Sequence, residues 1–383
     1  MTTIDETKPI EPVEQDSAVV EEKIYTASQW QLMRMRFLKH KPAVIGGSIV
    51  ILLYTVAILC DFLAPYTLEY RDSNYSWAPP QRIRWVDSEG QFHLRPFVYG
   101  LTETRDPETW RTTFTADPKQ IFPVKLLAKG EPYKFWGLWE TDVHLIGPAE
   151  PGGTLYMLGT DRLGRDLLSR IIYGSRISLS IGLIGVLLSL LLGATLGGIS
   201  GYYGGIADML IQRVVELLRS VPDIPLWMAL SAALPPTLSP IKVYFGITVI
   251  LSAIGWTGLA RVVRGKFMSL REEDFVMAAR LAGANERRII FQHLMPSFLS
   301  HIIVTVTLAI PGMILGETAL SFLGLGLRPP VVSWGVLLKD AQQVQTLAHQ
   351  PWLLVPAFAV IVTVLCFNFV GDGLRDAADP YSR

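Results

Sequence analysis

The chain has 383 residues, of which 50% are hydrophobic and 18% are charged, and its formal net charge is zero. Its mean hydropathy of +0.33 is too high for an ordinary soluble protein and predicts a polytopic membrane protein. The balanced charge gives no sign of a nucleic-acid partner. Both cysteines, Cys60 and Cys366, lie in apolar runs, which favours buried thiols over a disulfide or a metal site.

The N-terminal part of the chain predicts a tail, a surface segment and one membrane span. Residues 1–27 are acidic, contain proline and lack periodicity, so we expect a disordered cytoplasmic tail. Residues 28–64 begin as a basic amphipathic segment and continue into an apolar run, 43–63, that is long enough to cross a bilayer. The basic side chains before this run place the N-terminus in the cytoplasm. The run begins too far along the chain for a signal peptide.

A long polar insert follows the first span. It covers residues 65–176 and is expected to lie outside the cell, because the preceding span begins inside. Strand-like runs at 92–101 and 121–127, together with many Pro and Gly residues, predict a β-rich subdomain. Trp136 and Trp139 favour local packing or a membrane-interface anchor, with a ligand-binding site as the alternative.

Residues 177–371 are expected to form a five-helix transmembrane core, followed by a short cytoplasmic tail at 372–383. A short re-entrant or interfacial helix is expected around residues 334–338. Together with the first span, the core predicts an all-α protein of six transmembrane helices with both termini in the cytoplasm. The five later spans are predicted at residues 177–203, 214–234, 243–260, 298–320 and 352–370.

Some residues inside these spans predict packing and polar contacts. Small residues recur every four positions in the second span, so we expect a face for close helix packing at Gly193, Gly197 and Gly201. The third span should be kinked or delayed by Pro222 and Pro225, and an ion pair is expected between Glu216 and Arg219. We expect Glu317, in the fifth span, to form structural hydrogen bonds.

The loop at residues 261–297, between the fourth and fifth spans, is basic and polar, which places it in the cytoplasm. Apolar residues at helical spacing predict a short helix with one small-residue face, formed by Phe275, Ala278, Ala279 and Ala282. Gly283 is expected to end this helix, a second short helix to cover 284–294, and Pro296 to end the unit or open the next span. Two short helices between membrane spans are typical of a docking element.

The sequence lacks the motifs of an enzyme or a self-driven transporter. It has no P-loop for nucleotide phosphates, no H-E-x-x-H zinc helix and no G-x-S-x-G nucleophile elbow. Its six histidines are scattered, so we predict no catalytic, cofactor or metal site. The spans also lack the clustered acids and histidines of a proton-driven carrier. These absences favour a transport pore that a partner drives, over an ion-driven carrier, a channel or a membrane-embedded enzyme.

Residues 272–296 resemble the cytoplasmic signature loop of ABC importer permeases, which has the pattern E-A-A-x3-G-x9-I-x-L-P. His293 and Met295 stand where Ile and Leu are usual. The E-A-A places, the Gly and the final Pro are taken by Met277, Ala278, Ala279, Gly283 and Pro296.

Two further stretches are similar to the dipeptide and oligopeptide branch of this family, which also includes opine and nickel permeases. The first reads GTDRLGRDLLSR at 159–170, followed by YGSR at 173–176. The second reads ALSFLGLG at 319–326, followed by a Pro pair and Trp334. The order of these motifs resembles the second, C-type permease subunit. Most of the insert lies outside the resemblance.

The resemblance implies a fold of the type I ABC importer permease kind in the bacterial inner membrane. It also implies three kinds of partner besides lipid: a homologous second permease, two ABC ATPase subunits that bind ATP and magnesium, and an external substrate-binding protein. The loop at 272–296 would dock in a groove of the ATPase and transmit its movement to the spans. Peptides are the expected solutes, with opines, nickel chelates and short oligosaccharides as alternatives.

Overall fold

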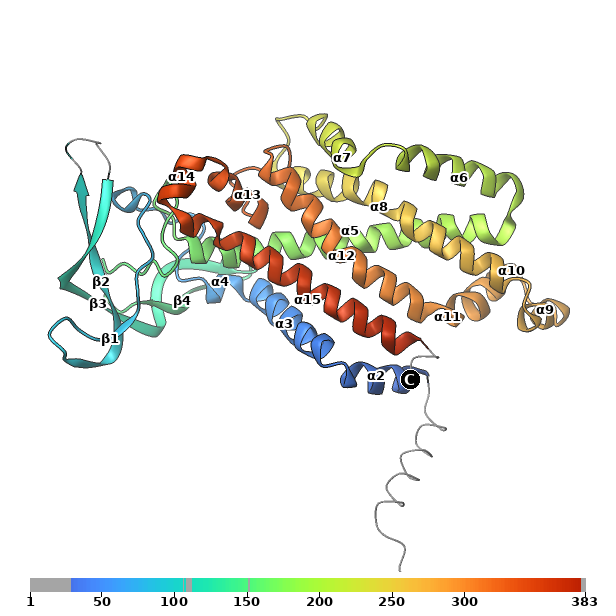
Figure 1. Cartoon of the computed structure of the whole chain (residues 1–383), viewed down its shortest axis with the longest axis horizontal. Helices are drawn as coiled ribbons and strands as arrows, with labels where there is room; N and C mark the ends of the chain where they lie inside the picture. The colour runs from blue at the N-terminus through green and yellow to red at the C-terminus, as the bar shows by residue number, and fades with distance from the viewer. Residues whose placement is uncertain (1–28, 106, 108–111, 151, 380–383) are drawn as a thin grey trace, which may run out of the picture.

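The helices run along one long axis, and a small antiparallel sheet lies at one end of them (Figure 1). The structure, a computed structural model, describes residues 29–379 except 106, 108–111 and 151. The predicted tail at 1–27 and the last residues, 380–383, therefore lie outside the described residues.

Five helices of the described chain are long and apolar enough to cross a membrane. α5 runs through the middle of the bundle, and α8 and α12 pack against it, whereas α15 packs on α12 and α3 (Figure 1). α5 begins at Leu167, earlier than the predicted span at 177, because the side chain of Asp166 caps its first turn. The five helices are α3 (Lys41–Ile58), α5 (Leu167–Tyr203), α8 (Pro240–Leu270), α12 (Leu299–Phe322) and α15 (Val355–Ala378).

The predicted third span, residues 214–234, is wrong as one continuous helix. The structure has α6 (Gly205–Arg219) and α7 (Asp223–Ala232) instead, separated by a break that ends at Pro222. Proline has no backbone N–H to donate within a helix, which explains the break. α6 carries a charged or polar side chain about every turn, so it lacks the apolar window of a span. In place of the six expected spans, the described chain has five helices of spanning length and this broken pair.

The pair nevertheless returns the chain along the bundle. In Figure 1, α6 and α7 lie one after the other beside α8, and both contact it. The predicted ion pair within this segment is also wrong. Glu216 bonds to Arg213 at 2.9 Å and not to Arg219, although both arginines lie three positions from it on α6.

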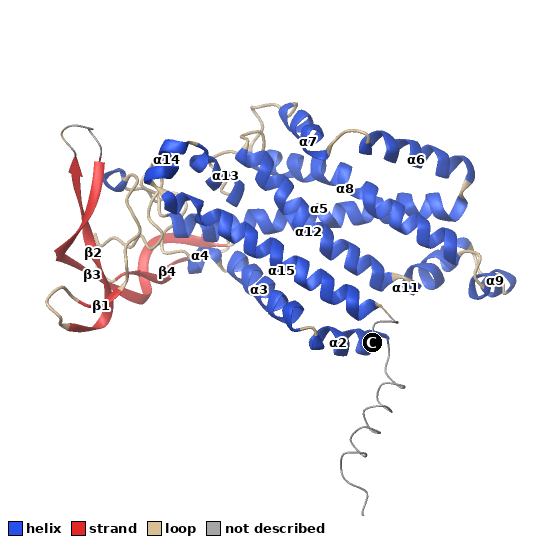
Figure 2. Ribbon diagram, viewed as in Figure 1, coloured by secondary structure: helices blue, strands red, loops and turns tan. Residues whose placement is uncertain are grey.

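The insert contains a four-stranded antiparallel sheet in the order β1-β2-β3-β4 (Figure 2). The first half of β3 pairs with β2 and its second half pairs with β4, with a register break between Lys129 and Tyr133. Both predicted strand runs fall within longer strands. The strands are β1 (Arg84–Val86), β2 (Phe92–Arg105), β3 (Thr112–Phe135) and β4 (Trp139–Pro148).

Short elements complete the chain. The predicted amphipathic segment forms α2 next to the start of α3, and the short helix predicted around residues 334–338, re-entrant or interfacial, corresponds to α13. The short elements are α2 (Gln29–Lys39), α4 (Cys60–Leu63), η1 (Ser73–Tyr75), α9 (Asp274–Leu281), α10 (Glu286–Arg288), η2 (Ile289–Leu294), α11 (Met295–Ser297), α13 (Trp334–Lys339), η3 (Asp340–Gln342), α14 (Val344–His349) and η4 (Pro351–Leu354).

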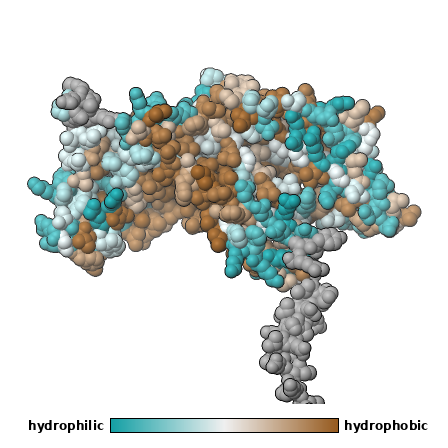
Figure 3. All heavy atoms as spheres, viewed as in Figure 1, coloured by the Kyte–Doolittle hydropathy of each residue, from teal (hydrophilic) through white to brown (hydrophobic). Residues whose placement is uncertain are grey.

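The main core lies where α5, α8 and α12 meet, around Ile181, Leu251 and Ile314, which are fully buried. The outward side chains of the same helices are also apolar. Figure 3 shows hydrophobic residues across the middle of the molecule and hydrophilic residues toward both ends. A helix that is apolar on all sides is typical of a membrane span, because both its core face and its lipid face are apolar.

Candidate functional site: the loop between α8 and α12

α9 lies at the end of the molecule opposite the sheet (Figure 1). Val276 is completely buried in a cluster with Phe267, Ile289 and Leu294, and Ala279 packs on the same cluster. The predicted small-residue face is therefore divided. Ala279 faces the chain itself, whereas the exposed side of the turn is formed by Phe275, Met277, Ala278, Leu281 and Ala282.

Gly283 ends α9 through backbone geometry. Its φ of +78° lies in the left-handed region, and an added Cβ would meet no atom within 4 Å. Two hydrogen bonds close the helix end: Gly283 N–H donates to Arg280 O, and Ala284 N–H donates to Ala279 O, both at 3.0 Å. This pair of bonds is a Schellman motif, for which glycine is the preferred residue. Glycine is thus needed here for its conformation and not for space.

The second half of the loop is helical but irregular. Asn285 caps it by accepting a hydrogen bond from the Arg288 N–H at 2.9 Å. The predicted helix at 284–294 consists of α10 and a π-helical turn, η2, with Ile289 and Leu294 buried. Pro296 is exposed in the first turn of α11, where its missing N–H is not needed. Pro296 therefore opens the approach to α12.

The loop contacts the end of α5 through three polar groups that the sequence did not reveal. The Arg280 guanidinium lies 5.8 Å from the centre of the Tyr202 ring. Tyr203 Oη donates to Glu286 Oε2 at 2.9 Å, and Arg271 Nη1 donates to the carbonyl oxygens of Gly201 and Tyr202 at 3.2 Å. Tyr202 and Tyr203, two adjacent polar aromatic residues at the end of an apolar helix, were the only local sign in the sequence of a contact at this position.

The three predicted packing glycines of α5 all lie against α8. An added Cβ would come within 2.4 Å of Ala260 O at Gly197 and within 2.6 Å of Arg264 O at Gly201. At Gly193 it would lie 2.9 Å from the Leu259 Cβ. Real Cβ atoms do not approach other atoms this closely, so each position needs a residue without a side chain.

An ion pair between α6 and α8 lies near these glycines. Arg264 donates from Nε to Asp208 Oδ1 at 2.5 Å and from Nη2 to Asp208 Oδ2 at 2.6 Å. Ser200 of α5 also bonds to Asp208. This two-pronged contact joins three helices on the α9 side of the bundle. It was missed because Asp208 and Arg264 are 56 positions apart in the sequence.

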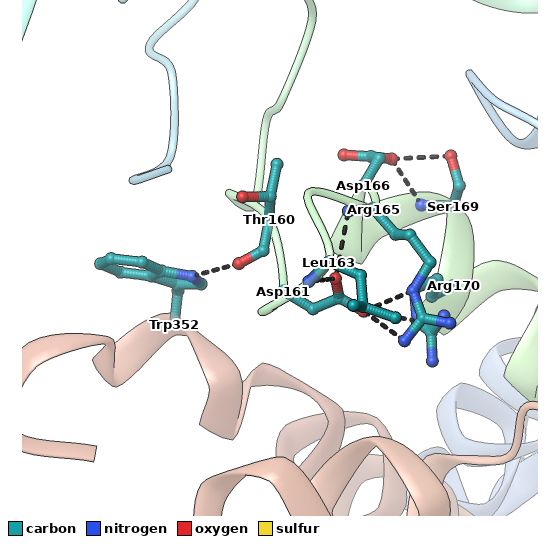
Figure 4. A network of polar contacts seen from close by, with 8 residues as sticks. All are labelled: Thr160, Asp161, Leu163, Arg165, Asp166, Ser169, Arg170 and Trp352. Atoms are coloured by element: carbon teal, nitrogen blue, oxygen red, sulfur yellow. Dashed lines mark hydrogen bonds and ion pairs between the residues drawn. The ribbon is translucent and has the colours of Figure 1, made fainter. Parts of the chain in front are cut away.

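The motif at 159–170 forms a polar network at the sheet end of α5 (Figure 4). Asp161 accepts hydrogen bonds from the backbone of Leu163 and Arg165, and from Arg165 Nε at 2.7 Å. Arg170 Nε lies 3.5 Å from the same carboxylate. Asp166 Oδ2 accepts from Ser169 N at 2.7 Å. The network fixes the chain where the insert ends and α5 begins.

Glu317 holds the short helix α13 to the spans. Its buried carboxylate accepts hydrogen bonds from Ser178 Oγ of α5, Ser321 Oγ of α12 and Ser333 Oγ, at 3.3, 2.8 and 2.6 Å. Ser333 in turn caps α13. The geometry agrees with the hydrogen-bonding role expected for this residue. Among the described residues, no group of three His, Cys, Asp or Glu is placed to hold a metal ion.

Comparisons with known proteins identify the group to which these elements belong. Residues 193–383 match the family model described as the binding-protein-dependent transport system inner membrane component. Residues 28–80 match the N-terminal TM domain of oligopeptide transport permease C. Both matches agree with the resemblance found in the sequence motifs.

Two curated relatives each match more than half of the chain. The chain is 44% identical to the oligopeptide transport system permease protein OppC of Haemophilus influenzae, over 64% of this chain and 76% of the relative. It is 43% identical to the dipeptide transport system permease protein DppC of Alkalihalophilus pseudofirmus, over 59% of this chain and 72% of the relative.

Among solved structures, the chain is similar to a chain of the inward-facing MetNI methionine ABC transporter. The TM-score is 0.44 and the identity is 16%, over 55% of this chain and 97% of that chain. The family assignment rests on the family models and the curated relatives. The chain belongs to the family of binding-protein-dependent transport system inner membrane components, in the branch of the OppC and DppC permeases.

Proposed function

We propose that the chain is one permease subunit of an ATP-driven importer for peptides or similar small solutes, and that α9 receives the movement of an ATPase. The peptide class is supported by relatives whose names are oligopeptide and dipeptide permeases. The ATPase is a separate subunit, since the sequence carries no P-loop. The chain itself then holds no cofactor, and ATP and magnesium bind to the partner.

The single observation that carries the coupling role is the exposed face of α9. Leu281 is 89% exposed, and the neighbouring Phe275 and Met277 are also exposed. The rest of the described chain leaves Leu281 almost uncovered and Phe275 and Met277 partly uncovered, whereas Val276 on the opposite side is buried. A short helix with one anchored face and one open apolar face is suited to bind a groove on a partner.

We place this end of the molecule in the cytoplasm of the bacterium and the sheet outside the inner membrane. Basic residues concentrated in 261–297 support this orientation by the positive-inside rule. In the proposed topology α6 and α7 together make the third crossing, which gives six crossings with both termini inside. A homologous second permease, two ATPase subunits and an external binding protein complete the assembly.

The contacts of α9 define a path for movement. When the ATPase dimer closes on ATP, it displaces α9 as a rigid body. Val276 transmits this displacement to the cluster under α8 and α12, and Arg280 transmits it to Tyr202 at the end of α5. The same spans then change between inward-facing and outward-facing arrangements of the pore.

The test is Leu281→Asp, which puts a charge on the exposed face and breaks no contact within the described chain. We expect loss of ATPase co-purification in mild detergent and loss of ATP-dependent peptide uptake by proteoliposomes. The matched control is Leu94→Asp, because Leu94 of β2 is 88% exposed. It should keep both activities. Normal uptake by Leu281→Asp, or uptake that needs no ATP, would refute the coupling role.

A further inference from the structure

The tip of the β3–β4 hairpin carries an exposed cluster of apolar and aromatic side chains. The turn reads Phe135, Trp136, Gly137, Leu138 and Trp139. Leu138 is 71% exposed and Trp139 is 66% exposed. The turn itself is well formed, since Gly137 N–H donates to Lys134 O and Leu138 N–H donates to Phe135 O. An ordered turn that exposes such side chains needs a surface to receive them.

This tip is attached to the end of the first membrane helix. Trp136 Nε1 donates to the carbonyl oxygen of Ile58, the last residue of α3, at 2.9 Å. Arg176 of α5 lies 4.9 Å from the centre of the Trp136 ring and forms an ion pair with Asp61 at 2.7 Å. The backbone N–H of Trp136 also points to Asp61 Oδ2 at 3.4 Å. The hairpin tip is thus held at a fixed depth relative to α3 and α5.

The length of α3 determines what that depth is. An 18-residue helix is about 27 Å long at 1.5 Å per residue. The hydrocarbon core of a bilayer is about 30 Å thick. One end of α3 therefore lies at each boundary of the core, and Ile58 marks one of them. A tryptophan bonded to Ile58 lies at the level of the lipid headgroups, where Trp is enriched in membrane proteins.

The surfaces on either side of the tip agree with this depth. On the α3 side, Ile51, Leu52 and Ile58 are exposed, and Figure 3 shows the hydrophobic surface of the spans extending toward the sheet. On the other side of the tip, Lys134 and Glu140 form an exposed ion pair at 3.1 Å. Apolar side chains thus lie between the lipid-facing surface of α3 and a charged pair that favours water.

We propose that the hairpin tip, residues 135–139, inserts into the headgroup region of the lipid bilayer beside α3. Lipid fits this surface better than a protein partner does, because the tip continues the apolar surface of a spanning helix. Trp side chains suit the interface in particular, since the ring packs against acyl chains while the indole N–H bonds to a polar group. Inserted in this way, the tip fixes the sheet relative to the membrane surface.

The test places a nitroxide spin label on Leu138→Cys and, separately, on Leu94→Cys of β2. The full chain is purified with its accompanying subunits and reconstituted in nanodiscs of phosphatidylethanolamine and phosphatidylglycerol. Both native cysteines are buried, so unmodified protein reports background labelling. The measurement is the accessibility of each label to oxygen, which concentrates in lipid, relative to a water-soluble nickel chelate. Both positions are exposed, so neither change removes a core contact.

We expect the oxygen-to-nickel accessibility ratio at position 138 to be severalfold higher than at position 94. Equal ratios at the two positions would place the tip in water and overturn the proposal. A label at 138 that is shielded from both reagents would overturn it as well, because a second permease or a binding protein would then cover the tip. Neither outcome depends on transport, so the result is separate from the coupling role of α9.

Discussion

Gly197 of α5 lies so close to Ala260 of α8 that an added Cβ would stand 2.4 Å from the Ala260 carbonyl oxygen. The contacting atom is backbone, which cannot turn aside as a flexible side chain can. The two helices are therefore fixed at a distance that only glycine permits at this position, beside the Asp208–Arg264 ion pair that joins α6 to α8.

Substitution of Gly197 by alanine should destabilise the helix pair. Overpacking of this kind typically costs about 1–3 kcal/mol, and we expect a lower thermal midpoint for unfolding in detergent. Gly198→Ala is the matched control, because its added Cβ would meet Phe267 at an ordinary 3.6 Å. If the two variants unfold at the same temperature, the close packing of α5 on α8 is not important for stability.

Substitution of Gly283 by valine should remove ATP-dependent uptake while the protein still inserts in the membrane. The left-handed backbone costs a residue with a Cβ about 1–2 kcal/mol, and valine is strained further by its branched Cβ, so the turn after α9 should rearrange. Gly265→Val of α8 is the control, since an added Cβ there also meets nothing within 4 Å but the backbone is helical. Uptake should be measured with equal amounts of inserted protein.

Substitution of Asp208 by asparagine should weaken the junction of α6 with α8. Hydrogen bonds to charged partners contribute about 1.5–3 kcal/mol each when they are sheltered, and this pair is only 18% and 29% exposed. We expect a loss of about 2 kcal/mol in unfolding free energy. Glu216→Gln should change stability little, because its pair with Arg213 on the same helix is largely exposed. A double-mutant cycle with Arg264→Gln would isolate the coupling energy.

Asp166 should make stability depend on pH in an unusual direction. Burial raises the pKa of its carboxyl from 3.8 to about 7. The folded chain then retains a proton that the unfolded chain releases, so stability is highest near pH 4 and falls as the pH rises to about 7. Asp166→Asn keeps an acceptor for the Ser169 N–H but carries no charge.

The Asp166→Asn variant should therefore match the original protein near pH 4 and exceed it at pH 8. The shift of about three units sets an upper limit of about 4 kcal/mol on the difference. Thermal unfolding in detergent at a series of pH values measures it. A gain of equal size at both ends of the series would mean that the charge of Asp166 is not the cause.

Local patterns in the sequence predicted local structure well. The place of Gly283 after a periodic segment predicts a helix end, and its left-handed φ of +78° gives the physical basis. The spacing of Gly193, Gly197 and Gly201 identified the face of α5 that meets α8. Both signals depend only on residues that are close together in the chain.

Features formed by residues that are far apart in the chain could not be predicted from local sequence patterns. Pro222 and Pro225 predict a kinked or delayed helix and not a full break between α6 and α7, because hydropathy alone does not distinguish a bent helix from two helices. The sequence did not identify Val276 as the buried anchor of α9, because the residues that bury it come from α8, the second half of the loop and α12. The Asp208–Arg264 pair needed the fold before its members could be brought together.

The 37 residues of α5 form one helix about 55 Å long without an internal proline. Its first turn belongs to the network of Asp166 and Arg170, and its last turn contacts the loop of α9 through Tyr202 and Tyr203. Any equilibrium that tilts this helix is therefore shared by both sides of the membrane. If a protein bound at the sheet prefers one tilt, it alters the affinity of α9 for the proposed ATPase. Thermodynamic reciprocity then requires the ATPase to alter binding at the sheet by the same factor.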